Sequence, residues 1–483
     1  MRTAFVAAVA DGDRAHTTAV TRSSLLIDVY STKSTVVVGR KPYCPIGQYC
    51  ICVCAYGIMF VFFRMNNRRE FVLKETRCRM IKAEEIEMLI DASDRLVSAV
   101  PTDFRRYLSP KIDWEERLLC VKGPKGTGKT TLVLQHIKEK FGPGSDAAVY
   151  FALDHVWFSN HNPLDAIEYF HTHGYTHLFI DEVHHYADWS RLIKTATDFY
   201  PALNIAYSGS SILKLSVGQA DLSRRQTVYN LKGMSFREFL AYEGVADLPV
   251  LPLGKILKDH RRIALGICGE IKIVPLFERY LMSGYYPFYK TCAGHFADRL
   301  VEMVNSVLNV DLPAVEGITP PTVQKARKML MVLAQSCPQQ PNMSALYREL
   351  ETERNMGIRL LGALERAELF SGIDQVQGKL KHLSRPAKIF LGDTNLMNAL
   401  VPRPDVGAMR ETFFANQLRA AGHSLLAPDK GDYVVDGSSL FEIGGVGKGF
   451  GQIKDVENSY VVNDGIEAGH GNKIPLWLFG FLY

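Results

Sequence analysis

A glycine-rich loop that precedes a helix is the clearest chemical signal in the sequence. Residues 117–122 form a short apolar run typical of a buried strand, and Gly-Pro-Lys-Gly-Thr-Gly-Lys-Thr-Thr follows at 123–131. Glycines at the first, fourth and sixth positions permit positive φ, so that backbone N–H groups can surround phosphate oxygens at the start of a helix. In this spacing we expect Lys129 to reach the β- and γ-phosphates of a nucleotide and Thr130 to ligate Mg²⁺. The expected nucleotide-binding residues are Gly123, Pro124, Lys125, Gly126, Thr127, Gly128, Lys129, Thr130 and Thr131.

Two acids close a later apolar run, about fifty residues after the loop. Asp181 and Glu182 follow Leu-Phe-Ile at 178–180, as expected of a buried parallel strand. Such a strand delivers its last side chains to the carboxyl edge of the sheet, where ligands bind in α/β proteins. We expect Asp181 to hold Mg²⁺ and Glu182 to polarise the attacking water. The pattern therefore predicts ATP and Mg²⁺ as the ligands.

Two further candidates follow along the chain. The run 203–207 ends in Ser208-Gly-Ser-Ser211. Ser208 is the candidate sensor of the γ-phosphate, Ser210 or Ser211 could replace it, and a serine turn without a catalytic role is the other interpretation. Arg224 and Arg225 lie further on, and Arg225 is the candidate arginine finger, acting in cis or from a neighbouring subunit. An ordinary surface arginine pair is equally compatible with the sequence.

The elements that must position these residues alternate along the chain. Apolar runs at 117–122, 147–153, 178–182 and 203–207 indicate strands, and helical spacing is found at 83–97, 132–141 and 163–172. Strands that alternate with helices are typical of an α/β fold with a parallel sheet.

The longer motifs resemble a known family. The run from Asp181 to Ser190 (DEVHHYADWS) resembles the Walker B region of a bacterial and archaeal AAA-type P-loop ATPase family. The segments 208–211, 231–240 and 284–287 resemble later motifs of that family, in the same order. The resemblance implies an AAA-type P-loop NTPase sheet, a winged helix and a degenerate restriction-endonuclease-like α/β domain. The implied domains are 80–290, 291–395 and 396–483, after an atypical segment 1–79.

The middle segment agrees with a winged helix. Helices are expected at 322–335, 342–350 and 356–370, followed by a basic pair of strands within 379–391. In the DNA-binding form of this fold the third helix enters the major groove. Here that helix carries Arg359 and Arg366 beside Glu365 and Glu368, a weakly basic set. A structural linker is therefore favoured over DNA binding.

Acidic residues of the last hundred residues suggest a second metal site. Asp432 and Glu442 are expected on adjacent strands, with Glu411 on a nearby helix, as in Mg²⁺-dependent nucleases. The family pattern has a lysine two residues after the glutamate, where this chain has Gly444. Lys448 is the nearest lysine, in a glycine-rich stretch that can bend back. Nuclease activity is therefore not expected. The apolar segment 474–483 is expected to form a core strand.

Charge and cysteine content narrow the class of protein. Residues 1–79 carry a surplus of +7, whereas the rest of the chain carries −2, so bulk charge does not support a nucleic-acid partner. Most of the nine cysteines are scattered singly, which fits the reducing cytoplasm. The apolar run 49–63 has 15 residues, short of the ~20 that a spanning helix needs. We hypothesise that translation starts at Met65 or Met80; a membrane anchor, which is not favoured, and a genuine extra strand or helix are the alternatives.

The sequence thus predicts an ATP hydrolase whose turnover drives a conformational change. A nucleotide-gated switch and a DNA-binding or nuclease-related protein are the alternatives. A homo-oligomer and an unidentified protein partner are compatible with these features.

Overall fold

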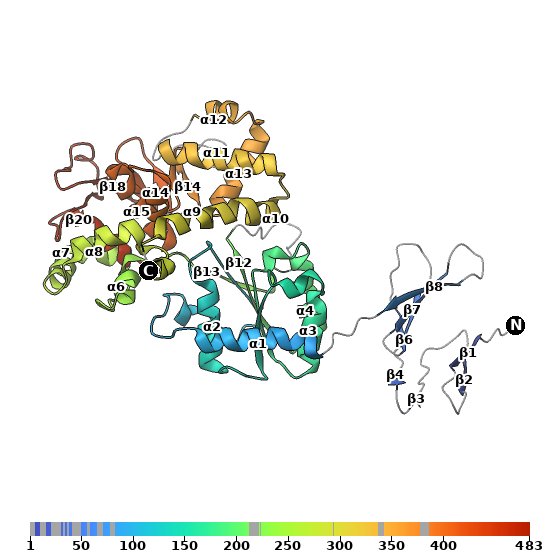
Figure 1. Cartoon of the computed structure of the whole chain (residues 1–483). Coiled ribbons are helices and arrows are strands. Elements are labelled where there is room, and N and C mark those ends of the chain that lie inside the picture. Colours follow the sequence, from blue (N-terminus) through green and yellow to red (C-terminus); the bar gives the residue numbers. More distant parts are fainter. Residues whose placement is uncertain are drawn as a thin grey trace. The chain divides into compact units, whose positions relative to one another are not determined.

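The structure is a computed structural model of the whole chain (Figure 1). It describes residues 84–211, 222, 224–292, 294–336, 342–376 and 386–483, together with Ala83 and the backbone of eight short strands before it. The chain divides into two compact units, Met1–Glu85 and Ile86–Tyr483, and each is described by itself.

The described part of the first unit consists of antiparallel strands. They are β1 (Phe5–Val9), β2 (His16–Val20), β3 (Tyr30–Ser31), β4 (Ser34–Thr35), β5 (Val38–Arg40), β6 (Cys50–Ala55), β7 (Ile58–Arg64) and β8 (Phe71–Arg77). β1 pairs with β2, β3 with β4, and β5 to β8 pair in order. Much of the apolar run 49–63 therefore lies in the paired strands β6 and β7 and not in a helix. The hypothesis about the start of translation stays a prediction.

A five-stranded, all-parallel sheet forms the first part of the Ile86–Tyr483 unit. Its order is β10-β11-β12-β9-β13. The strands are β9 (Leu118–Gly123), β10 (Ala148–Ala152), β11 (His177–Asp181), β12 (Asn204–Ser210) and β13 (Thr227–Asn230). The first four occur where the apolar runs predict them, because a sheet buried on both faces needs continuous apolar segments. β13 was not predicted, since its four residues are half-buried or exposed.

Helices lie beside this sheet. They are α1 (Ala83–Ala99), α2 (Lys129–Lys140), α3 (Pro163–Thr172) and α4 (Trp189–Phe199), with 3₁₀ turns η1 (Ser109–Lys111), η2 (Val156–Ser159) and η3 (Val183–His185). Apolar residues of α1, α2 and the sheet share one core cluster, to which Val97, Leu132 and Phe179 belong. The strand ends that carry the candidate residues are therefore held by a packed core.

Helices dominate the middle of the unit. They are α6 (Phe236–Tyr242), α7 (Leu253–Cys268), α8 (Ile273–Arg279), α9 (Phe296–Ser306), α10 (Leu312–Glu316), α11 (Pro320–Ser336), α12 (Met343–Glu349) and α13 (Arg354–Arg366). Two π-turns, η5 (Tyr280–Gly284) and η7 (Val307–Asp311), extend α8 and α9, and η6 (Pro287–Thr291) is a 3₁₀ turn. α11, α12 and α13 occur where three helices were expected.

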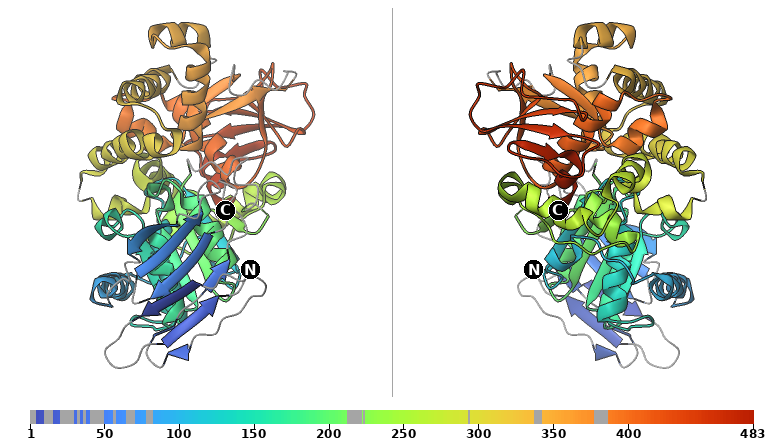
Figure 2. Two further views of the ribbon diagram at one scale, coloured as in Figure 1. Left: turned by 90° about the vertical axis from the view of Figure 1, so that its right-hand side faces the viewer. Right: turned by 90° about the vertical axis from the view of Figure 1, so that its left-hand side faces the viewer.

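A seven-stranded sheet completes the unit, in the order β15-β14-β16-β17-β18-β19-β20. Its strands are β14 (Phe370–Gln375), β15 (Lys388–Leu391), β16 (Leu425–Ala427), β17 (Tyr433–Val435), β18 (Ser439–Gly444), β19 (Ser459–Asn463) and β20 (Lys473–Pro475). The remaining elements are α14 (Thr394–Leu400), α15 (Val406–Ala420) and the 3₁₀ helix η8 (Leu476–Phe481). In Figure 2 the red and orange strands of this sheet lie beside orange and yellow helices.

This part of the chain corrects three predictions. Of the pair of strands expected within 379–391, β15 is present, and residues 377–385 lie outside the described part of the chain. β15 pairs with β14, which was not predicted, in the same sheet as β16–β20. The expected boundary at 395/396 falls inside α14. The segment 474–483 is buried as expected, but beyond β20 it is a 3₁₀ helix and not a strand.

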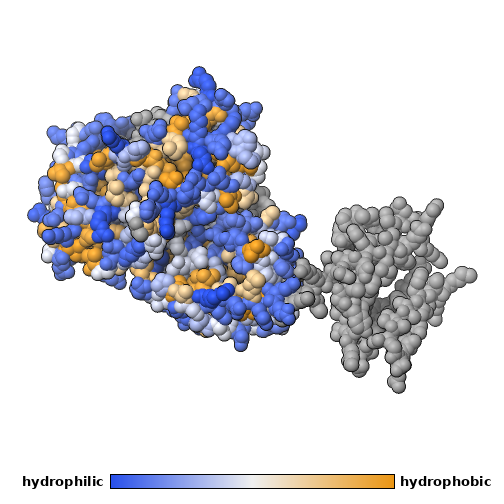
Figure 3. Space-filling model, in the orientation of Figure 1, coloured by the Kyte–Doolittle hydropathy of each residue, from blue (hydrophilic) through white to orange (hydrophobic). Residues whose placement is uncertain are grey.

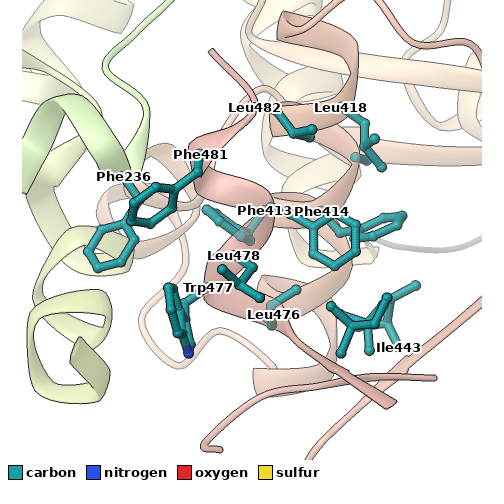
Figure 4. Packing of buried hydrophobic residues seen from close by; sticks show 14 of the residues in the cluster. Phe236, Phe413, Phe414, Leu418, Ile443, Leu476, Trp477, Leu478, Phe481 and Leu482 are labelled. Atoms are coloured by element: carbon teal, nitrogen blue, oxygen red, sulfur yellow. The ribbon is translucent and has the colours of Figure 1, made fainter. Parts of the chain in front are cut away.

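The boundary expected at 290 also differs from the packing. Phe236 of α6 and Phe277 of α8 share a core cluster with Phe413 of α15 and Trp477 of η8. Figure 4 shows Phe236 beside Phe481, and their ring centroids are 6.0 Å apart. Helices α6–α8 were assigned to the nucleotide-binding part, but they pack with the C-terminal sheet.

The surface of the second unit is mixed in character. On the face seen in Figure 3, hydrophobic residues lie among hydrophilic ones. Among the described residues, no helix combines the length and the apolar composition needed to cross a membrane.

Candidate active site

The glycine loop joins β9 to α2. Gly126 and Gly128 have φ of 80° and 91°, in the left-handed region that glycine adopts at low cost. Gly123 does not have positive φ, contrary to expectation. A Cβ there would lie 2.1 Å from the carbonyl oxygen of Leu231, so the residue is glycine because the chain after β13 passes close to it.

The loop lysine and threonines face different surroundings. Lys129 is buried, and its Nζ donates to the carbonyls of Gly123 and Pro124, each at 3.0 Å. Thr127 Oγ1 donates to the Pro124 carbonyl at 2.8 Å, which closes the loop. Thr131 is exposed on α2. The ammonium therefore lies over the loop, where phosphates are expected.

Two of the predicted residues, Thr130 and Ser208, meet at the carboxylate of Asp181. It is 3% exposed at the end of β11. It accepts hydrogen bonds from Thr130 Oγ1 at 2.6 Å, from the Tyr150 hydroxyl at 2.9 Å and from Ser208 Oγ. The backbone N–H of Glu182 donates to it as well, at 2.9 Å. Parallel strands bring their carboxyl ends together, so that Thr130, Asp181 and Ser208 meet as their positions in the sequence suggest.

Tyr150 was not expected in the site. It lies in β10, within an apolar run that predicts only a buried strand. Burial raises the pKa of its hydroxyl, and the negative charge of Asp181 raises it further. The phenol therefore keeps its proton and donates a hydrogen bond to Asp181. The available signal was a tyrosine two residues before the end of β10, beside Phe179 of β11 in register.

Glu182 lies in a strained backbone position. Its φ is 49°, in the left-handed region that non-glycine residues seldom adopt, and η3 begins after it. Its Oε2 lies 3.2 Å from His184 Nδ1. Burial raises the pKa of its carboxyl, although the nearby Lys129 ammonium opposes this. Among the described residues, Glu182, His184 and His185 are near enough to one another to share one ion.

A buried arginine, Arg106, is hydrogen-bonded to the backbone of the glycine loop. Arg106 is 5% exposed, and its Nε lies 3.0 Å from Glu238 Oε1. Its other nitrogens donate to the Thr127 carbonyl and, at 2.6 Å, to the Lys232 carbonyl. Ser235 and Glu238 form a capping box on α6. Arg106 thus links the glycine loop to a helix that packs with the C-terminal sheet.

The other serines and the arginine pair lie elsewhere. Ser210 is beside Gly123 in register, and the Ser211 N–H donates to the Gly123 carbonyl at 3.0 Å, so Ser208 is the serine on Asp181. Arg225 pairs with Asp198 and precedes β13, whose first residue is beside Leu119 near the amino end of β9. The loop follows the carboxyl end of β9. Arg225 is therefore at the opposite edge of the sheet from the loop, too far round to act as an arginine finger in cis.

The C-terminal acids are paired with lysines. Lys388 Nζ lies 3.0 Å from Glu411 Oε2 and 3.5 Å from Asp432 Oδ1. Lys448 bends back and pairs with Glu442. Its side chain occupies the space that a Cβ on residue 444 would need, so the glycine at this position makes room for it. Lys388 thus lies between Glu411 and Asp432, and Lys448 lies at Glu442; the metal site expected at Asp432 and Glu442 stays a prediction.

The expected ligands fit the nucleotide site. The Thr130 hydroxyl and the Asp181 carboxylate are hard oxygen donors, which Mg²⁺ prefers, and they meet at the carboxyl edge of the sheet. The loop with its two left-handed glycines opens at the amino end of α2, as phosphate binding requires.

Comparison with known proteins agrees with this geometry. Residues 115–240 match the family model of an AAA domain (AAA_14), and residues 274–406 match a domain of unknown function (DUF8612). A curated relative, an uncharacterized protein of Methanocaldococcus jannaschii, is 26% identical over 290 residues, which are 57% of this chain and 60% of that relative.

Solved structures align more loosely. A katanin structure on self-assembly is 16% identical, with coverage of 36% of this chain and 58% of katanin and a TM-score of 0.21. PCH-2 of C. elegans is 21% identical, with coverage of 34% and 46% and a TM-score of 0.20. AMPPCP-bound DnaA of Aquifex aeolicus is 13% identical, with coverage of 59% and 89% and a TM-score of 0.23. TM-scores at this level support no inference about this chain.

The AAA-domain match lies over the parallel sheet and the glycine loop. Together with the five parallel strands it supports the fold of an AAA-type P-loop ATPase, and with it a nucleotide-binding protein of that type. The winged helix and the restriction-endonuclease-like domain are not confirmed, because the match at 274–406 is to a domain of unknown function.

Proposed function

We propose that this protein binds ATP with Mg²⁺ and hydrolyses it to ADP and phosphate, and that turnover drives a conformational change in the C-terminal half. The observation that carries the proposal is the buried Asp181 carboxylate, on which Thr130 and Ser208 converge beside the glycine loop. A buried carboxylate is costly unless several donors face it, so a site of this composition is a candidate for function.

The nucleotide would bind along the loop. Thr130 and Asp181 would hold Mg²⁺, which offsets phosphate charge when it is bound. Lys129 would exchange the carbonyls of Gly123 and Pro124 for phosphate oxygens, since its ammonium already lies over the loop. The other loop residues would contribute backbone N–H groups.

Glu182 would act on the attacking water. The water oxygen forms a bond to the γ-phosphorus, the bond from that phosphorus to the bridging oxygen breaks, and the carboxylate accepts the proton. A carboxylate with a raised pKa is a better base near neutral pH, which supports this role. Ser208 would contact the γ-phosphate, and Arg225 would act from a neighbouring copy in a homo-oligomer. An unidentified protein partner would respond to the conformational change of the C-terminal half.

The proposal is tested by phosphate release from ATP by the full chain. Wild-type protein is expected to turn over, and Glu182→Gln to lose about 100-fold or more in kcat while still binding nucleotide, because the base is removed and the loop is not. Lys129→Ala is expected to lose nucleotide affinity. Glu116→Gln, which alters an exposed acid before β9, is the matched control and should behave as wild type.

The outcomes separate the alternatives. Turnover that is equal in Glu182→Gln and wild type would contradict the proposed base. Nucleotide binding without turnover in the wild type would support the nucleotide-gated switch instead. Loss of neither binding nor turnover in Lys129→Ala would exclude the loop as the site.

A further inference from the structure

The segment from Pro287 to Asp311 lies directly against the glycine loop. A Cβ on Gly126 would be 2.8 Å from Phe288 Cε1 and 2.9 Å from Met303 Sδ. Lys125 Nζ, in the loop, donates to Ser306 Oγ at 2.8 Å. Two loop residues thus contact η6 and α9, which lie outside the matched AAA domain.

Asp311 ends the π-turn η7 and is buried beside the site. Its side chain is 1% exposed. Its Oδ1 lies 3.6 Å from Lys125 Nζ and 3.5 Å from His184 Nε2, and neither carboxylate oxygen has a hydrogen bond of good geometry among the described residues. Burying a carboxylate is costly unless positive or donor groups face it. Lys125 and His184 are the groups that face it, one from each motif of the nucleotide site.

His184 connects Asp311 to Glu182. Its side chain is 1% exposed, Nδ1 lies 3.2 Å from Glu182 Oε2, and Nε2 lies 3.5 Å from Asp311 Oδ1; these are close charge contacts, since neither nitrogen has a hydrogen bond of good geometry among the described residues. The contact that one imidazole nitrogen makes fixes the ring and the tautomer, and hence what the other nitrogen presents. The carboxylate of Asp311, which lies at Nε2, therefore orients the imidazole ring and determines what Nδ1 presents to Glu182.

We propose that Asp311 is a positioning residue of the nucleotide site, which acts on Glu182 through His184 and on the glycine loop through Lys125. The C-terminal half then supplies a group that the AAA domain lacks, and the geometry of Glu182 depends on the packing of η7. This inference rests on the proposed function, because it assigns Asp311 to the hydrolytic step.

The test is steady-state ATP turnover of the full chain with Asp311→Asn. We expect kcat to fall by about 10- to 100-fold, since a misplaced catalytic group costs up to two orders of magnitude. KM for ATP should change by less than about threefold, because the loop backbone, Lys129 and Thr130 are retained. His184→Gln should show the same pattern. Because partial unfolding would also lower the apparent kcat at an unchanged KM, kcat is expressed per nucleotide-binding site, titrated with ADP.

A double variant tests the route. If Asp311 acts through His184, Asp311→Asn combined with His184→Gln is no slower than the slower single variant, whereas independent effects would multiply. Asp298→Asn is the matched control, since its side chain is 83% exposed on α9, and it should turn over as wild type does. Melting temperatures are measured alongside, and should Asp311→Asn be unfolded at the assay temperature, His184→Gln carries the test.

The outcomes are distinct. Wild-type kcat in both single variants, a rise in kcat, or losses that multiply would each overturn the inference while the proposed hydrolysis stands. Absence of turnover in the wild type would overturn the proposed function, and the inference with it.

Discussion

At the scale of single residues, the site depends on how many donors face Asp181. Thr130 and Ser208 could be predicted, because Thr130 follows the glycine loop at the start of α2 and Ser208 follows an apolar run near the end of a strand. Tyr150 could not, since a tyrosine inside an apolar strand usually fills core volume. Asp311 was beyond prediction for another reason: it is 130 residues from Asp181 in the chain, and only packing brings it to His184.

Tyr150→Phe should destabilise the nucleotide-free protein. It removes one donor from a buried carboxylate, and hydrogen bonds to charged groups contribute about 1.5–3 kcal/mol. Urea unfolding at neutral pH measures the loss in free energy of unfolding. Tyr347→Phe is the control, because the hydroxyl of this buried residue has no hydrogen-bond partner among the described residues. Equal stability of the two variants would show that the Tyr150 hydroxyl does not stabilise Asp181.

At the scale of elements, local patterns predicted seven of the fourteen described α-helices and the first four parallel strands. Asn342 begins the expected helix 342–350 and caps α12, with its side chain accepting from the Ala345 N–H at 3.0 Å. The strand expected in the segment 474–483 was wrong beyond β20. Its apolar residues contact α6 and α15 as well as the sheet, and a 3₁₀ helix places side chains on several sides whereas a strand has two. An apolar run alone cannot distinguish these cases.

Gly480→Ala should disturb this packing. A Cβ at Gly480 would be 2.4 Å from Phe236 Cβ and 3.2 Å from Phe413 Cζ, and overfilling a packed core costs about 1–3 kcal/mol. Gly266→Ala in α7 is the matched control, because no atom lies within 4 Å of the added methyl group. It should be stabilising by about 0.5–1 kcal/mol, as alanine is in a helix interior. The comparison is made by urea unfolding, and a loss in Gly480→Ala no larger than in the control would contradict this packing.

At the scale of the whole Ile86–Tyr483 unit, polar contacts join two of its hydrophobic cores, and a further core lies among α9–α14. The core of the parallel sheet is separate from the one that α6–α8 share with the C-terminal sheet. Between them lies the pair Arg106 and Glu238, with side chains 5% and 1% exposed. The sequence indicated the order of the domains along the chain. It did not indicate this ion pair, which we call the joint, because an arginine before β9 and a glutamate in α6 are distant in the chain.

The joint should make the two cores unfold together. Calorimetry of the full chain is expected to show one transition for this unit, since separating the cores leaves a buried charge without its partner, which costs about 3–5 kcal/mol. Arg106→Met should separate the transitions, whereas Arg105→Met, on the exposed neighbouring pair with Glu139, should not. If the wild type showed two transitions and added ADP shifted only one of them, the coupling between the cores would be contradicted.

The packing of α6–α8 with the C-terminal sheet also decides how such proteins can be recombined. A chimera that exchanges the nucleotide module between relatives at residue 290 would cut through a shared core, because Phe236 and Phe277 would come from one parent and Phe413 and Trp477 from the other. A junction just before Ser235 keeps that core within one parent. The Arg106 and Asp311 contacts are then among the pairs whose partners must be matched across the graft.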